Sequence, residues 1–285
     1  MATLIKVDTA AQAIVDAYHM IKFHGSEVTV RGMKTKELED VTFEFSSPHF
    51  CWTYGLRKSM KHVIGVAEAM QLIGAFSDPV RMCEIAPNMK AFLDGGIFKG
   101  AYGIRAGAQI DKIVELLKND PETRQAVITL RDPYRDLFEK SKDVPCTIAM
   151  SFRIRNGKLN MTTHMRSNDL VWGFPYDVIQ FCLLQMTIAE ELGIENGTYT
   201  HHADSLHVYE RHAKMMQECV SKFNDEANPQ PKLYGLSSRA FAADIFYCDD
   251  THIDKMTMLE KFLFNTVKAV FSQPQSSSEH TDTAA

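Results

Sequence analysis

The spacing of apolar residues changes along the chain, and each change marks an expected element. Residues 9–23 and 59–77 carry apolar side chains at helical spacing. Residues 27–47 alternate between apolar and polar side chains, as strands do, and the polar stretch RGMKTKE interrupts them. We therefore expect a helix, a pair of strands and a second helix, in that order, at the start of the chain.

The middle of the chain continues with a helix and then strands. The Gly-rich stretch DGGIFKGAYGIRAG precedes a helical run, AQIDKIVELLKND, which the Asn-Asp-Pro sequence at residues 119–121 is expected to end. QAVITLR is an expected strand. In TIAMSFRIRNGKLNMTTHMR two alternating runs meet at Asn156-Gly157, a dipeptide typical of a two-residue β-hairpin.

A long, mostly apolar helix is expected in FPYDVIQFCLLQMTIAEELG, with Pro175 in its first turn and Gly193 at its end. Apolar side chains surround this helix, so we expect it to be buried on most sides. The stretch TYTHHADSLHVYERHAKMMQECV then passes from strand-like to helical spacing. No repeat or linker divides the chain, which predicts one α+β domain over residues 1–271. Residues 272–285 form a polar tail that is expected to be disordered.

Composition and charge exclude several classes of protein. A formal net charge of -5 provides no basic surface, so we expect no nucleic-acid partner. No apolar run reaches the length of a spanning helix, and the N-terminus lacks a signal-peptide core, which predicts a cytoplasmic protein. The six cysteines are scattered without CxxC pairs, so neither a disulfide framework nor a metal cluster is expected.

Cys146 is the cysteine whose neighbours indicate chemistry. It follows Pro145 at the start of an apolar strand, which places a thiol at the end of a sheet. Arg166 lies twenty residues further on and could face the same site, where a cation would lower the thiol pKa. The other five cysteines are interpreted as small buried apolar residues.

Several motifs together resemble the thymidylate synthase family. They are KGAYGIR, IDKIVELLKNDPETRQAVITLRDP, the Pro-Cys pair, the GKL hairpin, RSND, GFPYD and DSLHVYERH, in this order and spacing. The resemblance extends over roughly residues 59–235 and is most specific from RSND to HVYERH. It implies a large mixed β-sheet flanked by helices, whose other face packs against a second subunit in a homodimer.

The resemblance also implies the substrates and the reaction. A pyrimidine nucleoside 5'-monophosphate would be the acceptor, and 5,10-methylenetetrahydrofolate would donate one carbon without a metal. Cys146 would add to C6 of the base, which makes C5 a carbon nucleophile. Loss of the C5 proton and of tetrahydrofolate would leave an exocyclic methylene group. Hydride transfer from the folate would give a methyl group, whereas addition of water would give a hydroxymethyl group.

Asp177 indicates which base is used. The dUMP-specific relatives resemble this stretch but have asparagine here, whose amide matches N3-H and O4 of uracil. A carboxyl group can accept from the amino group of cytosine and, when protonated, donate to N3. With MRSND and SLHVY around it, this aspartate resembles that of phage deoxycytidylate hydroxymethylases, which would act in the cytoplasm of a bacterial host. Alternatively, Asp177 only stabilises the N-terminus of its helix.

Arginines matching the family's phosphate ligands come from three parts of the chain. Arg166 and Ser167 would bind the phosphate, although a structural salt bridge remains the alternative for Arg166. Arg124 would reach the phosphate in the partner's site, but Gln125 replaces a second family arginine, which weakens that expectation. Arg31 and Lys34 of the RGMKTKE loop are further candidates, or else form a solvated turn.

The remaining family positions concern the sugar, the folate and proton transfer. His207 and Tyr209 would bind the 3'-hydroxyl of the sugar. Asp169 would hydrogen-bond the pterin, and Gly173 would leave room for the folate. Two further residues would move protons: Glu68 through ordered water, unless it is a structural buried acid, and Tyr102 near the C5 proton.

Hydroxymethylation of dCMP is the predicted reaction. Methyl-forming relatives close over the ligand with an apolar C-terminal end and a tryptophan against the folate. This chain ends EHTDTAA, has Asn88 near the tryptophan position, and carries its tryptophans elsewhere, at Trp52 and Trp172. The methylene group would therefore be open to water.

Several other functions stay open. They are dCMP methylation, CMP hydroxymethylation, a thymidylate synthase or hydroxymethylase acting on dUMP, and a catalytically silent nucleotide- or RNA-binding homologue. A Cys-His hydrolase is a further alternative, with Cys146 and one of His164, His201 and His202.

Overall fold

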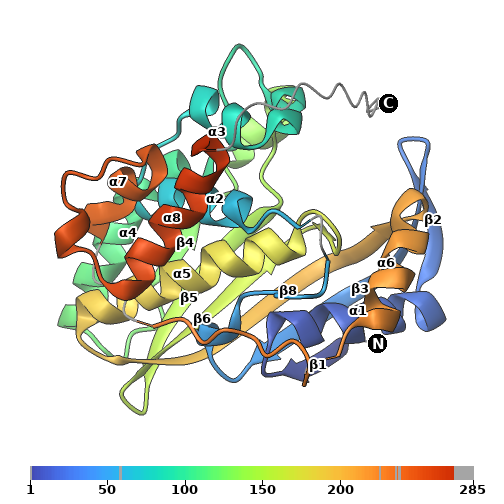
Figure 1. Ribbon diagram of the computed structural model, residues 1–285, viewed down its shortest axis with the longest axis horizontal. Coiled ribbons are helices and arrows are strands. Elements are labelled where there is room, and N and C mark those ends of the chain that lie inside the picture. The colour runs from blue at the N-terminus through green and yellow to red at the C-terminus, as the bar shows by residue number, and fades with distance from the viewer. Residues whose placement is uncertain (1, 58–59, 225, 235, 237–238, 273–285) are drawn as a thin grey trace.

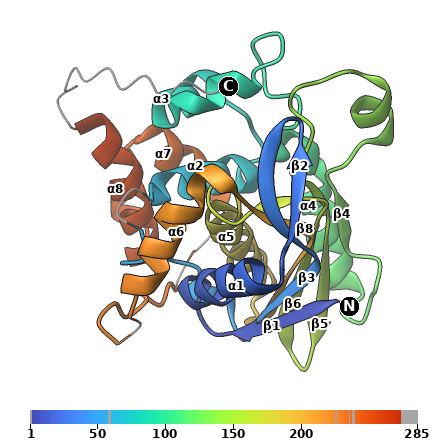
Figure 2. The same cartoon turned by 90° about the vertical axis from the view of Figure 1, so that its right-hand side faces the viewer.

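One mixed sheet with helices packed on one side forms the framework of the molecule (Figures 1 and 2). This computed structural model describes residues 2–57, 60–224, 226–234, 236 and 239–272. Within these residues the sheet has eight strands in the order β1-β3-β8-β6-β5-β4, with β2 beside β3 and β7 beside β8. The strands are β1 Thr3–Val7, β2 Ser26–Val30, β3 Met33–Phe45, β4 Val127–Thr129, β5 Thr147–Arg155, β6 Lys158–Met165, β7 Asn168–Asp169 and β8 Glu195–Tyr209.

The centre of the sheet is the long strand β8, which pairs differently on its two sides. It runs antiparallel to β3 and parallel to β6. The β5–β6 hairpin turns at Asn156 (φ 53°) and Gly157 (φ 72°), as expected from the sequence, because two consecutive left-handed residues form the turn that matches strand twist. The end of β8 therefore lies beside the starts of β5 and β7.

Helices cover the apolar face of this sheet (Figure 2). The α-helices are α1 Ala10–His24, α2 His62–Ile73, α3 Pro79–Ile85, α4 Tyr102–Asn119, α5 Phe174–Leu192, α6 Glu210–Lys222, α7 Ala242–Tyr247 and α8 Met258–Ser272. Short turns are η1 Pro48–Phe50, η2 Pro87–Phe92, η3 Tyr134–Phe138, η4 Arg239–Phe241 and η5 Ile253–Lys255. No helix in this described part combines the length and apolar content needed to cross a membrane.

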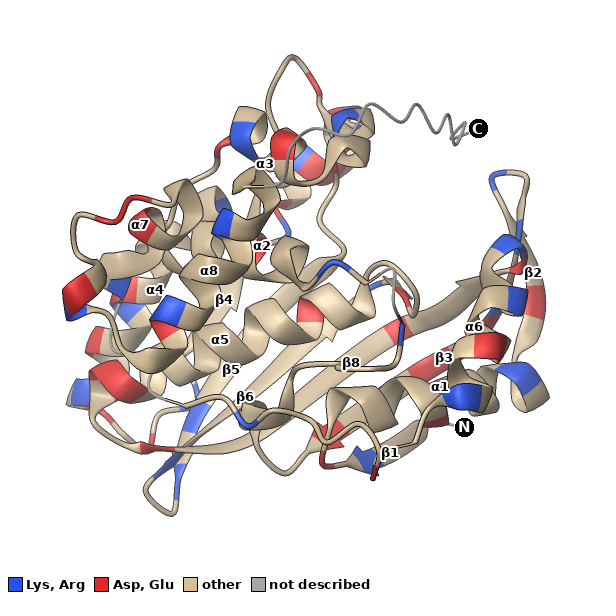
Figure 3. Ribbon diagram, in the orientation of Figure 1, with Lys and Arg blue, Asp and Glu red and all other residues tan. Residues whose placement is uncertain are grey.

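Helix α5 is the most deeply buried helix, as its apolar sequence predicted. Its residues 174–189 are all buried, and Figure 3 shows almost no charged ribbon along it. Gly193 ends the helix at φ 66°, a left-handed conformation that glycine adopts without steric cost. Gly65 of α2 lets α5 approach closely, because a Cβ there would lie 3.1 Å from Ile179 Cβ. The first turns of α5 therefore pack closely against α2.

Two expectations from the sequence are corrected by the structure. The polar stretch RGMKTKE interrupts the strands only at Arg31-Gly32, because β3 already begins at Met33. Helix α4 starts at Tyr102, within the Gly-rich stretch, rather than at residue 108. A Cβ at Gly103 would lie 2.2 Å from the Phe76 carbonyl oxygen, so this glycine permits close packing on the end of α2.

The C-terminal region contains two helices, α7 and α8, that the sequence pattern did not predict. Helix α8 includes Ser272, the first residue of the expected tail. Residues 273–285 of that tail lie outside the described residues.

The two faces of the sheet differ in character. In β8, Tyr199, His201 and Ala203 point toward the helices and are buried. His202 and Asp204 alternate with them and are partly exposed, as are Thr162 and His164 of β6. The second face is therefore polar.

Candidate active site

Cys146 lies immediately before β5, where the chain enters the sheet. Its carbonyl accepts a hydrogen bond from the Arg166 backbone N–H, at 2.9 Å, which joins it to the end of β6. The Arg166 side chain donates through Nε to the Pro145 carbonyl and through Nη2 to the Val144 carbonyl, both at 3.0 Å. The same Nη2 lies 3.6 Å from Cys146 Sγ. Backbone carbonyls thus orient the guanidinium beside the thiol, as the sequence predicted.

The thiol pKa differs from the expectation. Burial raises the pKa of Cys146 above its ordinary value, and the positive charge of Arg166 opposes this shift without overcoming it. The negative charge of Asp177 raises it further. Cys146 is therefore a protonated thiol at neutral pH, and a negative charge must leave the site, or a positive charge enter, before a thiolate is favoured.

Asp177 lies in the first turn of α5 and is 8% exposed. Its Oδ2 accepts from Asn168 Nδ2 at 2.7 Å, and its Oδ1 accepts from Gln180 Nε2 at 2.9 Å. Burial raises the pKa of Asp177 to about 7, even though both hydrogen bonds favour the charged form. Near neutral pH this carboxyl can therefore be a donor or an acceptor.

Glu68 on α2 is a second carboxyl in the same region. Burial, together with the charge of Asp177, raises the pKa of Glu68 to about 8. Two nearby carboxyls that disfavour each other's ionisation can hold and release a proton near neutral pH. This is the combination expected of a site that moves protons rather than one that only stabilises the fold.

A chain of buried hydrogen bonds holds the Asn168 amide that contacts Asp177. Asn168 Oδ1 lies 2.9 Å from His201 Nε2, and His201 Nδ1 lies 2.8 Å from the Tyr199 hydroxyl. Burial lowers the pKa of His201 to about 3, so its ring stays neutral. A neutral ring that donates from Nε2 and accepts at Nδ1 fixes the orientation of the amide. Sequence reasoning missed this role, because the partners are far apart along the chain.

Tyr102, in the first turn of α4, contacts Thr147, the residue that follows Cys146. Its hydroxyl oxygen accepts from the Thr147 amide at 3.2 Å and from Thr147 Oγ1 at 3.0 Å. Burial raises the Tyr102 pKa well above 10, and the charges of Asp177 and Cys146 act in the same direction. Tyr102 therefore keeps its proton in the free protein, with its oxygen positioned by the strand that follows the cysteine.

The expected sugar and folate residues meet at the end of β8. Strand β7 pairs with β8 so that Asp169 lies opposite His207, whose ring contacts the Tyr209 ring edge-to-face at 5.2 Å. Asp169 Oδ1 accepts from the Val171 amide at 2.8 Å, which closes the turn before α5. At Gly173, a Cβ would lie 2.9 Å from Asn168 Nδ2, so glycine is required here for the fold as well.

The expected phosphate ligands do not all lie together in the structure. Ser167 is half-buried directly after Arg166. Arg31 is exposed at the β2–β3 turn (φ 51°), and its charge acts on Tyr209. Lys34, also exposed, lies 3.9 Å from Glu210 in an ion pair. Arg124 is exposed in the loop before β4.

Arg57 is a buried cation that sequence reasoning missed. It is 8% exposed, and within the described residues none of its three side-chain nitrogens makes a hydrogen bond of good geometry. Its guanidinium carbon lies 4.3 Å above the Trp172 ring, and its charge interacts with Asp169 and Tyr176. Burying a guanidinium without hydrogen-bond partners lowers the stability of the fold, unless an anionic group or a polar ligand binds to it. No motif in the sequence signalled this residue.

The histidines proposed for a Cys-His hydrolase are engaged elsewhere. His201 belongs to the Asn168 chain, and both His164 and His202 bond Asp204 on the opposite, polar face of the sheet. The geometry in the described residues therefore does not support that alternative.

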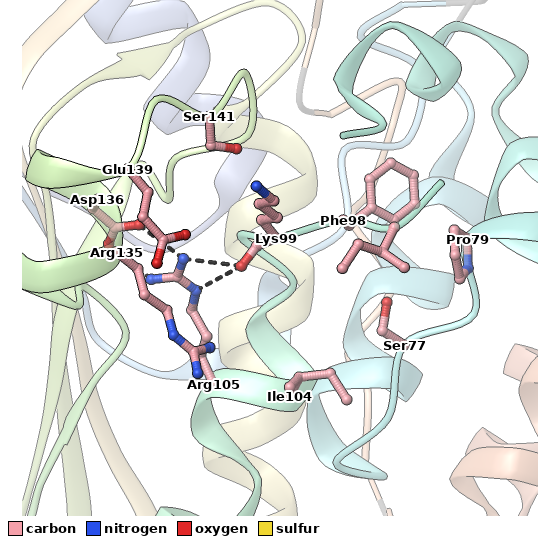
Figure 4. Close-up of a pocket in the computed structure, with 11 residues that line it drawn as sticks. Ser77, Pro79, Phe98, Lys99, Ile104, Arg105, Arg135, Asp136, Glu139 and Ser141 are labelled. Carbon is pink, nitrogen blue, oxygen red and sulfur yellow. Dashed lines mark hydrogen bonds and ion pairs between the residues drawn. The ribbon is translucent and has the colours of Figure 1, made fainter. Parts of the chain in front are cut away.

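A cavity of about 490 Å³ lies away from this chemistry, between the start of α4 and the loop after β4 (Figure 4). Lys99, Arg105 and Asp136 line it, together with apolar side chains such as Phe98. Arg105 donates to both carboxylate oxygens of Asp136, at 2.7 and 2.8 Å. This ion pair anchors the loop that leads to Cys146.

Comparisons with known proteins place this site in a family. The model described as Thymidylate synthase matches residues 98–263. A deoxyuridylate hydroxymethyltransferase from Bacillus phage SP01 is 33% identical over 216 residues, covering 70% of this chain and 56% of the relative. Another, from Pseudomonas phage M6, is 29% identical over 247 residues, covering 82% of this chain and 70% of the relative. The chain thus spans little more than half the length of the SP01 protein.

The fold agrees with the family. The thermostable thymidylate synthase A from Bacillus subtilis matches with a TM-score of 0.66 and 21% identity, covering 75% of this chain and 84% of that one. This likeness establishes the predicted thymidylate synthase-like fold, a mixed sheet flanked by helices. Because the family model also covers more than half of the 285 residues, the chain belongs to the thymidylate synthase family.

Proposed function

We propose that this protein transfers a one-carbon unit to C5 of a pyrimidine nucleoside 5'-monophosphate, with methylenetetrahydrofolate as donor and a hydroxymethyl nucleotide as product. The observation that carries the proposal is the grouping of a thiol, an arginine and two carboxyls of raised pKa. Family membership supports the same reaction class. The names of the two phage relatives support hydroxymethyl as the group transferred.

Cys146 is proposed as the nucleophile that adds to C6 of the base. Because its thiol is protonated in the free protein, addition requires that a proton leave sulfur and that charge on the ring be neutralised. Protonated Asp177 can donate to N3 of the ring as sulfur bonds to C6. Arg166, 3.6 Å from the sulfur, favours the thiolate that reacts. Glu68 and Tyr102 are proposed to relay protons at C5 and at the one-carbon unit.

The residues around Asp169 fit a folate. The folate would supply a carbon at the oxidation level of formaldehyde. Trp172 offers an aromatic surface, Asp169 accepts hydrogen bonds beside it, and the unpaired Arg57 guanidinium suits a carboxylate of the folate. Gly173 keeps the turn between them compact. These residues would bind and orient the folate.

Cytosine is the proposed base, and this proposal rests on Asp177. A neutral Asp177 can accept from the cytosine amino group and donate to N3, which is the pattern that uncharged cytosine presents. An ionised Asp177 can only accept, and its charge would then face the N3 lone pair. Turnover of dCMP should therefore fall as the pH rises through the Asp177 pKa of about 7.

Uracil is the second candidate base, because both phage relatives are named deoxyuridylate hydroxymethyltransferases. The raised pKa of Asp177 makes this candidate physically possible. The same proton that could be given to cytosine N3 could be given to uracil O4.

The rest of the nucleotide is assigned to the ligands already described. Arg166 and Ser167 would bind the phosphate, and His207 with Tyr209 would bind the sugar hydroxyl. Arg31 and Lys34 would close over the phosphate from the β2–β3 turn. Arg124 is exposed, as an arm that completes the site of a second subunit would be, so we propose a homodimer.

Product analysis on a panel of nucleotides tests the function. Protein is incubated with methylenetetrahydrofolate and CMP, dCMP or dUMP, and the products are identified by mass spectrometry. We expect 5-hydroxymethyl-dCMP and no rise in absorbance from dihydrofolate, which a methyl-forming reaction would produce. A 5-hydroxymethyl product from dUMP alone would contradict the choice of cytosine. The absence of product with all three nucleotides would contradict the proposed enzymatic function.

Cys146→Ala is the control for that panel. Loss of the nucleophile should abolish turnover, by about 10⁶-fold on the scale of other nucleophile deletions, and leave nucleotide binding intact. Unchanged turnover in this variant would contradict the proposed covalent step.

A further inference from the structure

The loop that ends at Cys146 contains Asp143, an acid to which the proposed reaction gives no role. Asp143 is half-buried, and its Oδ2 accepts a hydrogen bond from the backbone N–H of Gly100 at 2.7 Å. Gly100 lies directly before Ala101, the N-cap residue of α4. The carboxylate therefore joins the cysteine loop to the segment that leads into α4.

Gly100 and Asp143 also pack closely against each other. A Cβ at Gly100 would lie 2.9 Å from Asp143 Oδ1 and 3.0 Å from the Asp143 carbonyl oxygen, so the loop lies directly on the glycine backbone. The carbonyl of Lys99 accepts from Arg105 Nε at 3.0 Å, as Figure 4 shows. Both polar groups of the peptide bond between Lys99 and Gly100 are thus engaged, and hydrogen bonds hold this segment from two sides.

A second contact joins the same two parts of the chain on the other side of Cys146. The Tyr102 hydroxyl oxygen accepts from the Thr147 amide and from Thr147 Oγ1. The chain is therefore attached to the start of α4 both before and after the cysteine, through Asp143 and through Thr147. Two attachments restrict the position of the thiol more than either one alone, which matters because a misplacement of about 1 Å can cost about 100-fold in rate.

Electrostatics favour the same contact. The N-cap residue of α4 is an alanine, which has no side-chain acceptor for the free N–H groups of the first turn. A carboxylate near the N-terminus of a helix is stabilised by those groups and by the helix dipole. Burial raises the pKa of Asp143, and the Gly100 amide and the charge of Arg105 oppose this rise. The start of α4 thus favours the ionised carboxylate, although the charges of Asp136 and Asp94 act against it.

The charge of Asp143 also acts on the thiol. Burial raises the pKa of Cys146 most, and the charges of Asp177 and Asp143 add to this rise. The charges of Arg166 and Arg131 oppose it. Removal of the Asp143 charge alone should therefore lower the thiol pKa. An acid that disfavours the thiolate needs another reason to lie in the loop of the nucleophile, and its contact with the start of α4 supplies one.

We propose that Asp143 is a positioning residue for Cys146, because its carboxylate attaches the cysteine loop to the start of α4 and so fixes where the thiol lies. This role rests on the proposed function of Cys146 as the nucleophile. Asp143→Asn keeps an oxygen acceptor for the Gly100 N–H, so it should preserve the contact and remove only the charge. Asp143→Ala removes the contact and the charge together.

Hydrogen exchange followed by mass spectrometry tests the attachment in the intact protein, without nucleotide or folate. In Asp143→Ala the amides of residues 97–101 and 141–147 should exchange at least about tenfold faster than in the wild type, because loss of the contact lets both segments open. In Asp143→Asn their exchange should stay within about threefold of the wild type, since the contact is kept. Equal exchange in the wild type and Asp143→Ala would overturn the proposal.

Alkylation of Cys146 by iodoacetamide tests whether the Asp143 charge acts on the thiol. The rate is measured on the peptide that contains the cysteine, at a pH well below the thiol pKa. There a fall of about 0.5 in that pKa raises the thiolate fraction about threefold, so Asp143→Asn should react at least about threefold faster than the wild type. An unchanged rate in Asp143→Asn would contradict the placement of Asp143 beside the thiol.

Turnover provides a third measurement. The kcat of Asp143→Ala should fall by about tenfold or more, because the thiol is misplaced, and Asp143→Asn should restore it to within about threefold of the wild type. An equal loss in both variants would assign the effect to the charge and overturn the positioning role. Exchange and alkylation need no turnover, so an absence of transfer in the wild type would count against the proposed function and leave the test of Asp143 intact.

Glu139→Gln is the matched control, since it removes an equal charge from an exposed position of the same loop. It should leave both the exchange around Gly100 and the alkylation of Cys146 unchanged. If Asp143→Ala folds poorly, Gly100→Ala disturbs the same contact from the other side, because its Cβ would displace the carboxylate. Exchange should then rise in Gly100→Ala while the charge stays. Effects in Glu139→Gln as large as those in Asp143→Asn would reduce them to the net charge of the loop and overturn the assignment.

Discussion

Asp136 and Asp177 are both enclosed by protein, but their surroundings favour opposite protonation states. Burial alone would raise the pKa of Asp136, yet hydrogen bonds from Arg105 and the Asp132 amide, with the charge of Arg131 nearby, hold that pKa below its ordinary value. Asp177 has two amide donors and no cation in contact, so burial raises its pKa to about 7. A permanent ion pair fixes a loop, whereas a carboxyl near its pKa can exchange a proton.

The largest expected effect concerns the base-reading role of Asp177. Asp177→Asn replaces the carboxyl with an amide that matches uracil, so turnover of dCMP should fall and dUMP should become the better substrate. A site built for one hydrogen-bond pattern rejects the other by about 10⁴–10⁵-fold. The measurement is the ratio of kcat/KM for the two nucleotides. An unchanged ratio would show that Asp177 does not contact the ring.

The next effect concerns the Arg105–Asp136 pair. Arg105→Ala removes the cation that hydrogen-bonds both oxygens of the buried Asp136 carboxylate and leaves only Arg131, at 3.5 Å. The free energy of unfolding should therefore fall by about 3–5 kcal/mol. Urea denaturation measures this loss. Arg135→Ala is the control, because its ion pair with Asp132 is exposed and should contribute less than about 1 kcal/mol. Equal losses in the two variants would contradict the contrast.

Glu68→Gln should reduce turnover more than it affects the fold. The amide cannot exchange a proton, and loss of a general acid or base costs about 10²–10⁴-fold in rate. Thermal stability at pH 8 should not fall, because the variant removes a buried group that is partly ionised there. The result to look for is a lower kcat with an unchanged melting temperature. A destabilised variant with normal kcat would make Glu68 a structural acid.

The smallest effect is a pH dependence of stability. Asp177 and Glu68 have pKa values raised in the folded state, so their contribution is fully present below the unfolded values and lost as pH rises through about 7 to 8. Between pH 5.5 and 8.5 the wild type should lose more stability than Asp177→Asn, by about 1 kcal/mol or more. Parallel melting curves across this range would contradict the raised pKa.

Local sequence signals predicted the elements whose geometry is set locally. Asn156-Gly157 turns the β5–β6 hairpin because two consecutive left-handed residues need no distant partner. Gly193 ends α5 for a similar reason. The start of α4 was missed because Gly103 disfavours a helix intrinsically, and only its packing against Phe76 makes glycine necessary there.

The sequence predicted one contact of the site but not the electrostatics around it. Motif order indicated Cys146 and Arg166, which the structure brings together at 3.6 Å. The raised thiol pKa was missed because burial cannot be seen in the spacing of motifs. Arg57 was missed for the same reason, since an arginine in a polar stretch gives no sign that it lies buried beside Trp172.

Gly173 affects both the hydrogen bond that holds Asp177 and the turn that leads to the proposed folate site. The missing side chain at this position leaves room for the very Asn168 nitrogen that bonds Asp177, and the same turn carries Asp169 and Trp172 toward the proposed folate site. A single methyl group added here would push on the amide and thereby loosen the carboxyl that distinguishes one nucleobase from another. Choice of substrate and accommodation of the carbon donor would then have to evolve together, through one backbone position.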